Sequence, residues 1–223
     1  DKNNWLITPC STGYIIPSGN DLLQVSYKDQ YTPGPEGITD SSFGTLCATK
    51  AYFNHGIKPI RKKYCFAVVP TATPKRMSTY ARQLFCKENG AFDVRQHQDS
   101  LHVLKHIASN TLAYALFAPA KFLQEGMLCS VDSPLLLMER AEPENEILKL
   151  AVCSPDLRPE MTEAGKKWHS APTVSTLILR GGWKLAGSLP KGVSSCSKVG
   201  NNTELVLILK DGLPLYITLK SEE

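Results

Sequence analysis

The feature that most constrains the fold of this chain is the shortness of its apolar segments. Residues 22–27, 64–69 and 174–179 are examples: each is rich in β-branched, aromatic or leucine residues, and Gly, Pro, Asn or Asp residues lie between the segments. This pattern is typical of antiparallel β-sandwiches. We therefore expect an all-β chain. The other candidate strands are residues 5–8, 14–16, 44–53, 101–104, 112–117, 127–130, 135–139, 146–153, 183–186, 204–209 and 215–219.

One segment, residues 74–89, has the pattern of a helix instead. Thr73 can cap its first turn, Pro74 suits the first helical position, and Gly90 can end it. Its apolar residues recur with the period of a helix and form one stripe. They are Met77, Tyr80, Ala81 and Leu84. We expect this helix to pack on a sheet.

Two domains are expected, with a boundary close to residue 128. In residues 1–128, strands are mixed with the helix and with a Gly- and Pro-rich loop at 32–42. Residues 129–223 consist almost entirely of strand and turn patterns. A long polar loop at 154–172 interrupts this second part.

Composition excludes several classes of protein. The 223 residues carry a net charge of +4, and the basic residues are scattered, so a nucleic-acid partner is not expected. No apolar run approaches the length of about 20 residues that a membrane helix needs, so no membrane partner is expected either. The seven cysteines include no C-x-x-C pair, and we expect free, buried thiols rather than a zinc site.

No motif for a cofactor is present, and none is expected to bind. The chain has neither a phosphate-binding glycine loop nor a G-x-S-x-G nucleophile turn. His97, His102 and His106 are spaced so that the last two share one face of a helix or of a strand. Their neighbours favour a strand, and a metal needs further ligands in fixed geometry. We therefore expect solvated histidines and no metal.

Two residues on loops are candidates for contact with a sugar ring. His55 is followed by Gly56, a pair that can place an imidazole in a cleft, although a purely structural turn explains it as well. Trp168 lies in a polar stretch and either stacks on a ligand or covers an edge of the sandwich. Trp183 begins a strand and is expected in the core.

A known family shares the order of motifs along this chain. The motifs are NWLI at residues 4–7, GYIIP at 13–17, HGIKP at 55–59 and YCFAVVPTATP at 64–74. AYALF at 113–117, PLLLM at 134–138, SPDL at 154–157 and DGLP at 211–214 continue the series. The chain resembles the chondroitin sulfate ABC lyases, of the polysaccharide lyase family that also holds hyaluronate and chondroitin AC lyases.

The resemblance implies a position in a larger enzyme. Residues 1–128 would be the later part of a central super-sandwich that is similar to galactose mutarotases, and residues 129–223 a small C-terminal antiparallel sandwich. The enzymes are bacterial and secreted or periplasmic, and they cleave glycosaminoglycans by β-elimination. An upstream helical toroid carries their Asn, His, Tyr and Arg catalytic residues. The toroid and the glycosaminoglycan are therefore the implied partners.

No catalytic residue is carried over to this chain by the resemblance. Lys28 matches a family-like stretch and is a candidate for substrate contact, although Tyr27 stands where relatives often have Arg. We thus expect a C-terminal, non-catalytic part of a lyase. Two alternatives stay open. One is a stand-alone carbohydrate-binding module. The other is a mutarotase-type epimerase, for which His55 would need an acidic partner.

Overall fold

The computed structural model describes residues 4–17, 23–31, 45–62, 64–84, 90–156, 159–161 and 168–222 of the chain. The protein divides into two compact units, Asp1–Cys86 and Lys87–Glu223. Strands dominate both units, and they pair antiparallel throughout. The all-β prediction with a single α-helix near residue 74 is confirmed for the described residues.

The described residues of the first unit form five strands in two sheets. Strands β1 (Asn4–Ile7), β2 (Gly13–Ile16) and β5 (Ala67–Val69) form one sheet, with β2 in the middle. Strands β3 (Leu23–Tyr31) and β4 (Thr45–Phe53) form a two-stranded ribbon in unbroken register, from Leu23 opposite Phe53 onward. Unbroken register means that successive residues lie on opposite faces of the ribbon throughout.

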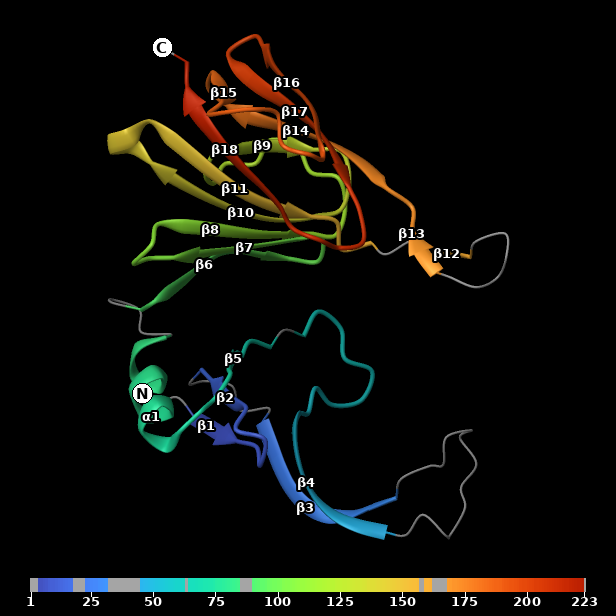
Figure 1. Ribbon diagram of the computed structural model, residues 1–223. Coiled ribbons are helices and arrows are strands. Elements are labelled where there is room, and N and C mark those ends of the chain that lie inside the picture. Colours follow the sequence, from blue (N-terminus) through green and yellow to red (C-terminus); the bar gives the residue numbers. More distant parts are fainter. Residues whose placement is uncertain are drawn as a thin grey trace. The chain divides into compact units, whose positions relative to one another are not determined.

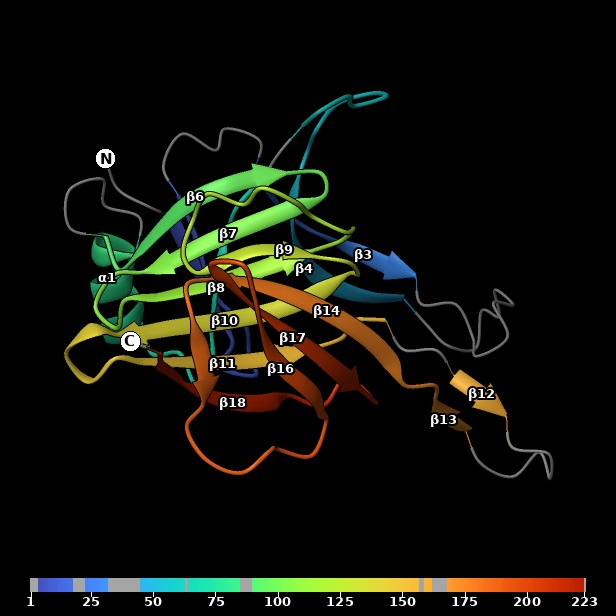
Figure 2. The ribbon, with the colours of Figure 1, turned by 90° about the horizontal axis from the view of Figure 1, so that it is seen from above.

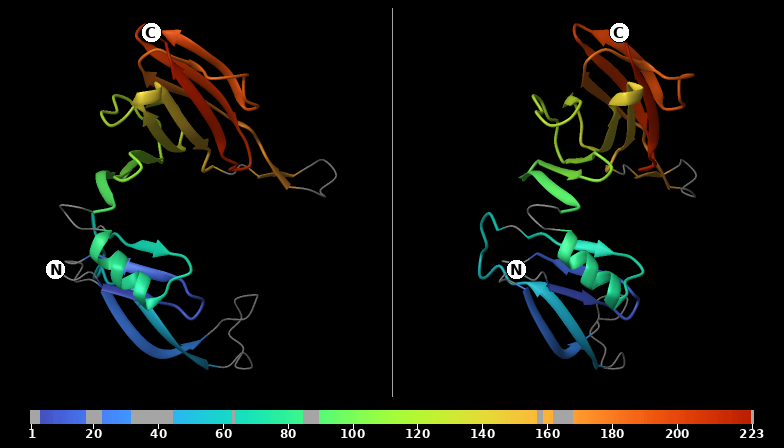
Figure 3. Two further views of the ribbon diagram at one scale, coloured as in Figure 1. Left: turned by 60° about the vertical axis from the view of Figure 1, so that its left-hand side comes forward. Right: turned by 90° about the vertical axis from the view of Figure 1, so that its left-hand side faces the viewer.

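Helix α1 (Pro74–Gln83) lies against strands β1 and β2 (Figure 3). The Thr73 side chain accepts a hydrogen bond from the backbone N–H of Arg76 at 3.3 Å, which confirms the predicted N-cap. Met77 and Ala81 are buried, as expected from the apolar stripe. The described helix ends at Gln83 with Leu84 as its C-cap, and residues 85–89 of the predicted helix lie outside the described residues.

The second unit is a two-layered sandwich (Figures 1 and 2). Its larger sheet has the strand order β15-β18-β11-β10-β8-β7-β6, and the smaller sheet has the order β16-β17-β14-β9. The larger sheet consists of β6 (Phe92–Gln98), β7 (Leu101–His106), β8 (Thr111–Leu116), β10 (Leu135–Glu142), β11 (Ile147–Cys153), β15 (Trp183–Leu185) and β18 (Leu215–Ser221). The smaller sheet consists of β9 (Leu128–Val131), β14 (Thr173–Arg180), β16 (Val193–Val199) and β17 (Asn202–Leu209).

The core of this sandwich follows from period-two alternation in both sheets. On β10, Leu135 and Leu137 point inward and are buried, while Leu136 and Met138 point outward. Leu177 and Leu205 do the same from the opposite sheet and are fully buried. Trp183 packs against this core, as predicted. A short 3-10 helix (η2, Pro143–Asn145) connects β10 to β11.

The division between the two compact units falls between residues 86 and 87, whereas the sequence predicts a domain boundary near residue 128. Strand β8 pairs with β10 along its whole length, and Val103 and Tyr114 contribute to the same core as Leu135. Strands β6 to β8 therefore belong to the sandwich of the second unit. The predicted loop at 154–172 also contains a small hairpin, β12 (Pro159–Met161) with β13 (Trp168–Ser170).

The prediction of buried cysteines is wrong for the described residues. Cys10, Cys47 and Cys65 are exposed, and the second unit leaves Cys129, Cys153 and Cys196 only half-buried. All six are free. The segment 64–69 was predicted as a strand with a buried thiol, but only Ala67–Val69 pairs with a neighbour. Among the described helices, none has the length and apolar character to cross a membrane.

Candidate functional site

His55 lies in a turn that begins where strand β4 ends. The side-chain oxygen of Asn54 accepts a hydrogen bond from the backbone N–H of Gly56 at 3.0 Å, and Gly56 has a φ of 78°. An Asx turn of this kind needs a residue that tolerates positive φ at the glycine position. The turn places the half-buried imidazole of His55 beside Phe53. His55 Nδ1 is buried and has no hydrogen-bond partner among the described residues.

Four further rings form a connected cluster with this imidazole, which itself contacts Phe53 and Tyr64. Phe53 lies 5.2 Å from Tyr64 and 6.2 Å from Phe66, measured between ring centroids, and the planes are tilted by 22° and 27°. Tyr64 and Phe66 are nearly parallel, at 8° and 6.1 Å. His55 is 5.8 Å from Tyr64. We call these residues the ring cluster, and its members are Tyr14, Phe53, His55, Tyr64 and Phe66.

The ring cluster is open to solvent on one side. Tyr64 is 54% exposed and Phe66 is 40% exposed, although both rings are held in contact with Phe53. Exposed, ordered aromatic rings are uncommon on a surface that only contacts water, and they are typical of binding sites. The cluster is therefore the candidate site of the first unit.

The segment that carries the cluster is basic. Between Asn54 and Phe66 the sequence has four basic residues and no acidic residue. Lys58, Arg61 and Lys62 are exposed, and none of the ion pairs among the described residues involves them. Lys58 and Arg61 also adopt positive φ, at 50° and 54°. The loop thus offers uncompensated positive charge beside the exposed rings.

The structure does not bring Lys28 to this site. Leu23 is opposite Phe53 in the ribbon, and Lys28 is five residues further along β3, so it lies on the other face. Lys28 shares that face with Lys50 and Tyr52, and all three are exposed. Trp168 forms part of β13, where its backbone pairs with Met161, but its side chain lies outside the described residues.

Sequence reasoning identified His55 but missed the rings of Tyr64 and Phe66. Both rings fall in the strand expected at residues 64–69, where the burial that the sequence predicts is that of Cys65 between them. The signal that marks them is the combination of alternating aromatic residues with a basic, acid-free segment just before them. Periodicity alone does not separate a buried aromatic face from an exposed one.

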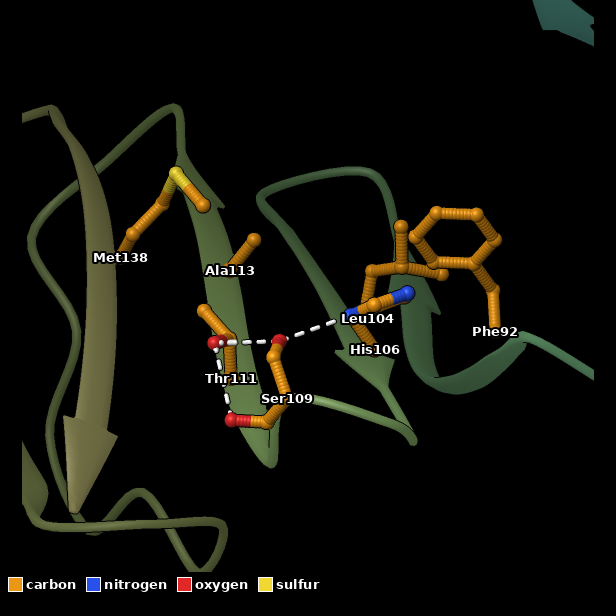
Figure 4. Close-up of a pocket in the computed structure, with 7 residues that line it drawn as sticks. All are labelled: Phe92, Leu104, His106, Ser109, Thr111, Ala113 and Met138. Atoms are coloured by element: carbon orange, nitrogen blue, oxygen red, sulfur yellow. Dashed lines mark hydrogen bonds between the residues drawn. The ribbon is translucent and has the colours of Figure 1, made fainter. Parts of the chain in front are cut away.

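The outer face of the larger sheet in the second unit holds a small pocket of about 250 Å³ (Figure 4). His106 Nδ1 lies 2.7 Å from Ser109 Oγ, which lies 2.8 Å from Thr111 Oγ1. A serine nucleophile also needs a third group that orients the histidine. Here the neighbour of the His106 ring is Phe92, at 4.9 Å. The hydrogen bonds that link His106, Ser109 and Thr111 therefore stabilise the turn between β7 and β8.

Next to this pocket, the same sheet face is hollowed and mostly apolar. The volume of the hollow is about 550 Å³. Its lining includes Leu104, Leu136, Met138, Ala151 and Tyr216. Leu136, Met138 and Tyr216 are exposed. The surface has few polar groups that would orient a reacting molecule.

The histidines of this region do not form a metal centre. His102 and His106 share one face of β7, as predicted for a strand. His102 is in edge-to-face contact with His97 at 4.5 Å and with Phe117 at 5.3 Å. Within the described parts of the chain, no group of three or more His, Cys, Asp or Glu residues is arranged to hold a metal ion.

A second polar cluster is buried inside the sandwich. Glu139 is 4% exposed, and its carboxylate accepts hydrogen bonds from the backbone N–H groups of Met127 at 2.7 Å and Leu128 at 3.2 Å.

The Tyr114 hydroxyl donates to the carbonyl of Glu125 at 2.9 Å. Arg180 donates to the carbonyls of Leu123 and Gly126. Together these groups hold the segment 123–128 against the sheet.

Burial shifts the acid–base properties of this buried cluster. Loss of water raises the pKa of Glu139, although the hydrogen bonds from Met127 and Leu128 oppose the shift. Burial also raises the pKa of Tyr114, and the charge of Glu139 adds to the effect. Perturbed groups of this kind often mark active sites, but every partner of Glu139 is structural and the carboxylate is sealed from solvent. We assign the cluster to stability.

Comparison with known proteins supports the resemblance seen in the motifs. The chain is 25% identical over 220 residues to a chondroitin sulfate ABC endolyase of Proteus vulgaris, an alignment that covers 98% of this chain and 20% of the relative. It is 27% identical over 187 residues to a chondroitin sulfate ABC exolyase of Bacteroides thetaiotaomicron, covering 75% and 18%. The resemblance to the chondroitin sulfate ABC lyases is confirmed. No protein-family model matches the chain.

The chain spans about one fifth of the length of these ABC lyases. Solved structures of polysaccharide lyases share its fold. A chondroitin AC lyase of Streptomyces coelicolor matches 98% of this chain and 26% of the lyase, with a TM-score of 0.63 and 13% identity. A xanthan lyase of Paenibacillus matches 95% of this chain and 19% of the lyase, with a TM-score of 0.54 and 11% identity.

Proposed function

We propose that this chain is the C-terminal, non-catalytic part of a bacterial glycosaminoglycan lyase that acts on chondroitin or dermatan sulfate. The observation that carries the proposal is a similarity to ABC lyases over 98% of the chain that covers only 20% of the relative. The role of the chain is to support the catalytic domain and to form one wall of the substrate cleft.

The chemistry of β-elimination supports a non-catalytic role. The reaction requires a group that neutralises the uronate carboxylate, a base for the C5 proton and an acid for the leaving oxygen. In the described residues, the shifted carboxylate of Glu139 is sealed in the core, and the His106–Ser109 pair stabilises a turn. The catalytic set belongs to the helical toroid in the family that the chain resembles, and we propose that domain as the partner.

The same proposal assigns the two parts of the chain and its location. Residues 1–128 correspond to the later part of the central super-sandwich, and residues 129–223 to the C-terminal sandwich. Because β8 pairs with β10, one continuous sheet crosses the boundary between these parts. The parent enzyme is secreted or periplasmic, where its polysaccharide substrate is found.

The test is an assay of the purified 223-residue chain on chondroitin sulfate, dermatan sulfate and hyaluronan. Ultraviolet absorbance of the unsaturated uronate product reports β-elimination directly. We expect no enzyme-dependent rise. A robust rise, lost on denaturation of the chain, would show that the chain carries its own catalytic residues.

The alternative function is a stand-alone carbohydrate-binding module, and the exposed ring cluster is the observation that favours it. The two functions differ in expected affinity. One wall of a cleft offers few convergent contacts, so a supporting part binds oligosaccharides weakly. A sub-micromolar dissociation constant in calorimetry at moderate salt would favour the module. The coding sequence upstream of Asp1 separates them as well, because only a lyase encodes a toroid there.

A further inference from the structure

We propose that the ring cluster and the basic loop beside it form a binding subsite for an anionic sugar unit of the polysaccharide. The proposal rests on the proposed function and extends it, because it names the residues that contact the glycan. Tyr64 and Phe66 supply the apolar contact surface. Lys58, Arg61 and Lys62 supply the charge. His55 and Phe53 hold the rings in place.

The ring geometry suits a pyranose. The faces of sugar rings carry polarised C–H bonds, and the faces of aromatic rings carry negative charge, so the two attract while apolar area is buried. Tyr64 and Phe66 have a nearly common orientation, 8° apart, and both retain exposed area. Contacts with Phe53 at 5.2 Å and 6.2 Å fix the two rings in advance. A fixed platform loses little entropy on binding.

The charge pattern specifies an anionic glycan rather than a neutral one. Chondroitin and dermatan sulfate carry carboxylate and sulfate groups along their whole length. The segment from Asn54 to Phe66 offers four basic residues and no acidic residue. Arg61 is exposed and can bind a carboxylate or sulfate with two parallel hydrogen bonds. A neutral polysaccharide would leave this charge unused.

Exposed apolar residues on the same loop offer a second possible occupant, a protein surface. Ile57 is 95% exposed and Ile60 is 79% exposed. A protein partner would bury these two side chains, whereas a glycan would use the rings and the cations. Ile57→Ser together with Ile60→Ser therefore separates the two occupants, and both positions tolerate polar residues because they face solvent.

The experiment is a titration of the whole 223-residue chain with chondroitin sulfate hexasaccharide at low and at moderate salt. Calorimetry measures the affinity, and NMR monitors the same titration. We expect weak, salt-dependent binding. Tyr64→Ala with Phe66→Ala should lower the affinity by at least about tenfold, because both apolar contacts are lost. Lys58→Ala with Arg61→Ala should weaken binding and reduce its salt dependence. A neutral oligosaccharide of the same length should bind more weakly than the sulfated one.

Matched controls lie on the opposite face of the β3–β4 ribbon. Tyr52→Ala removes a ring that is 45% exposed, and Lys28→Ala removes an exposed cation. Neither should change the affinity, and nor should the double isoleucine variant. Tyr64→Phe keeps the ring and should keep most of the binding. Circular dichroism confirms that each variant is folded, and the charge variants test the subsite even if the ring variants unfold.

Three results would overturn the subsite. One is the absence of any binding by the unmodified chain at millimolar oligosaccharide. Another is unchanged affinity in the folded ring and charge variants. A third is loss of affinity in the isoleucine or Lys28 variants alone. None of these results bears on the proposed function, which fails instead if the chain cleaves the polysaccharide by itself.

Discussion

The carboxylate of Glu139 occupies the space that a side chain at Gly126 would need. A Cβ atom built at Gly126 would collide with Glu139 Oε1 and with the Tyr114 hydroxyl, and would lie 2.7 Å from Leu112 Cδ1. The backbone of Gly126 has a φ of 64°, a conformation that residues with a side chain rarely adopt. Glycine at 126 is therefore required by the buried acid on β10.

Gly126→Ala should destabilise the second unit strongly. The positive φ and the collision with buried atoms together cost about 3 to 5 kcal/mol. The measurement is the free energy of unfolding from urea titration followed by circular dichroism. Gly187→Ala is the matched control, because a Cβ there meets nothing within 4 Å. It should change stability by less than about 0.5 kcal/mol. Equal effects of the two substitutions would contradict the packing of Glu139 and Tyr114 against Gly126.

Glu139 should make the second unit more stable as the pH is lowered toward its ordinary carboxyl pKa. Its pKa in the folded protein is raised above the usual 4.5 by burial. The folded state therefore binds the proton more tightly than the unfolded state does. The contribution of Glu139 to stability is fully present below pH 4.5 and is lost as the pH rises through the folded pKa.

The difference in melting temperature between the unmodified chain and Glu139→Gln isolates this effect. Glutamine does not titrate, and its NH₂ group leaves one of the two backbone N–H groups unpaired, at a cost of about 1 to 3 kcal/mol. The advantage of the unmodified chain should grow as the pH falls from 7 toward 4.5. Glu142→Gln is the control, because the pH dependence of its effect on stability should have the opposite sign. Hydrogen bonds from Lys149 and Arg140 lower the pKa of Glu142, so its contribution is lost as the pH falls.

Limited proteolysis should release a resistant fragment that begins close to residue 87. Val103 and Tyr114 lie in the core of the second unit with Leu135, so this fragment includes β6 to β8. The first unit buries fewer large side chains and should be digested first. Mass spectrometry of the fragment locates its N-terminus. A stable fragment that begins near residue 130 would instead support the boundary expected from the sequence.

The sequence predicts the strands of the second unit well, because local alternation and tertiary burial agree there. On β10 the inward positions, Leu135 and Leu137, are both apolar. The sequence does not predict which strands become neighbours. The pairing of β8 with β10 joins segments that local patterns assigned to different domains. Register across a sheet depends on contacts between residues that are distant in sequence. The local pattern of apolar residues does not specify those contacts.

In the candidate site, too, the sequence predicts the local features but not those that depend on strand pairing. A glycine-containing turn marks His55, and that turn is local. The exposure of Tyr64 and Phe66 depends on how much of the segment pairs with a neighbouring strand, and only Ala67–Val69 does. Cys65 is exposed and not buried as predicted, for the same reason. Partial burial still raises the pKa of its thiol. Only the resemblance points to Lys28, and the register of the ribbon places Lys28 on the face opposite to Phe53.

Gly13 on β2 lies in close contact with Met77 on α1. A Cβ atom at Gly13 would lie 2.6 Å from Met77 Cε and 2.8 Å from Ala72 Cβ, and Met77 is fully buried. Gly13→Ala should therefore overpack the first unit and cost about 1 to 3 kcal/mol. Hydrogen exchange of the amides in β2 and α1 measures this locally. Ser78→Ala, on the exposed side of the helix, is the control and should have little effect.

A double-mutant cycle distinguishes overpacking from a general loss of stability in the first unit. Met77→Ala alone leaves a cavity and costs about 2 to 5 kcal/mol. If Gly13 is required because the Met77 side chain fills the space above it, the methyl group of Gly13→Ala occupies part of that cavity in the double variant. The double variant should then be more stable than the sum of the single effects by about 1 kcal/mol. Strict additivity would mean that the helix does not pack on β2 through this contact.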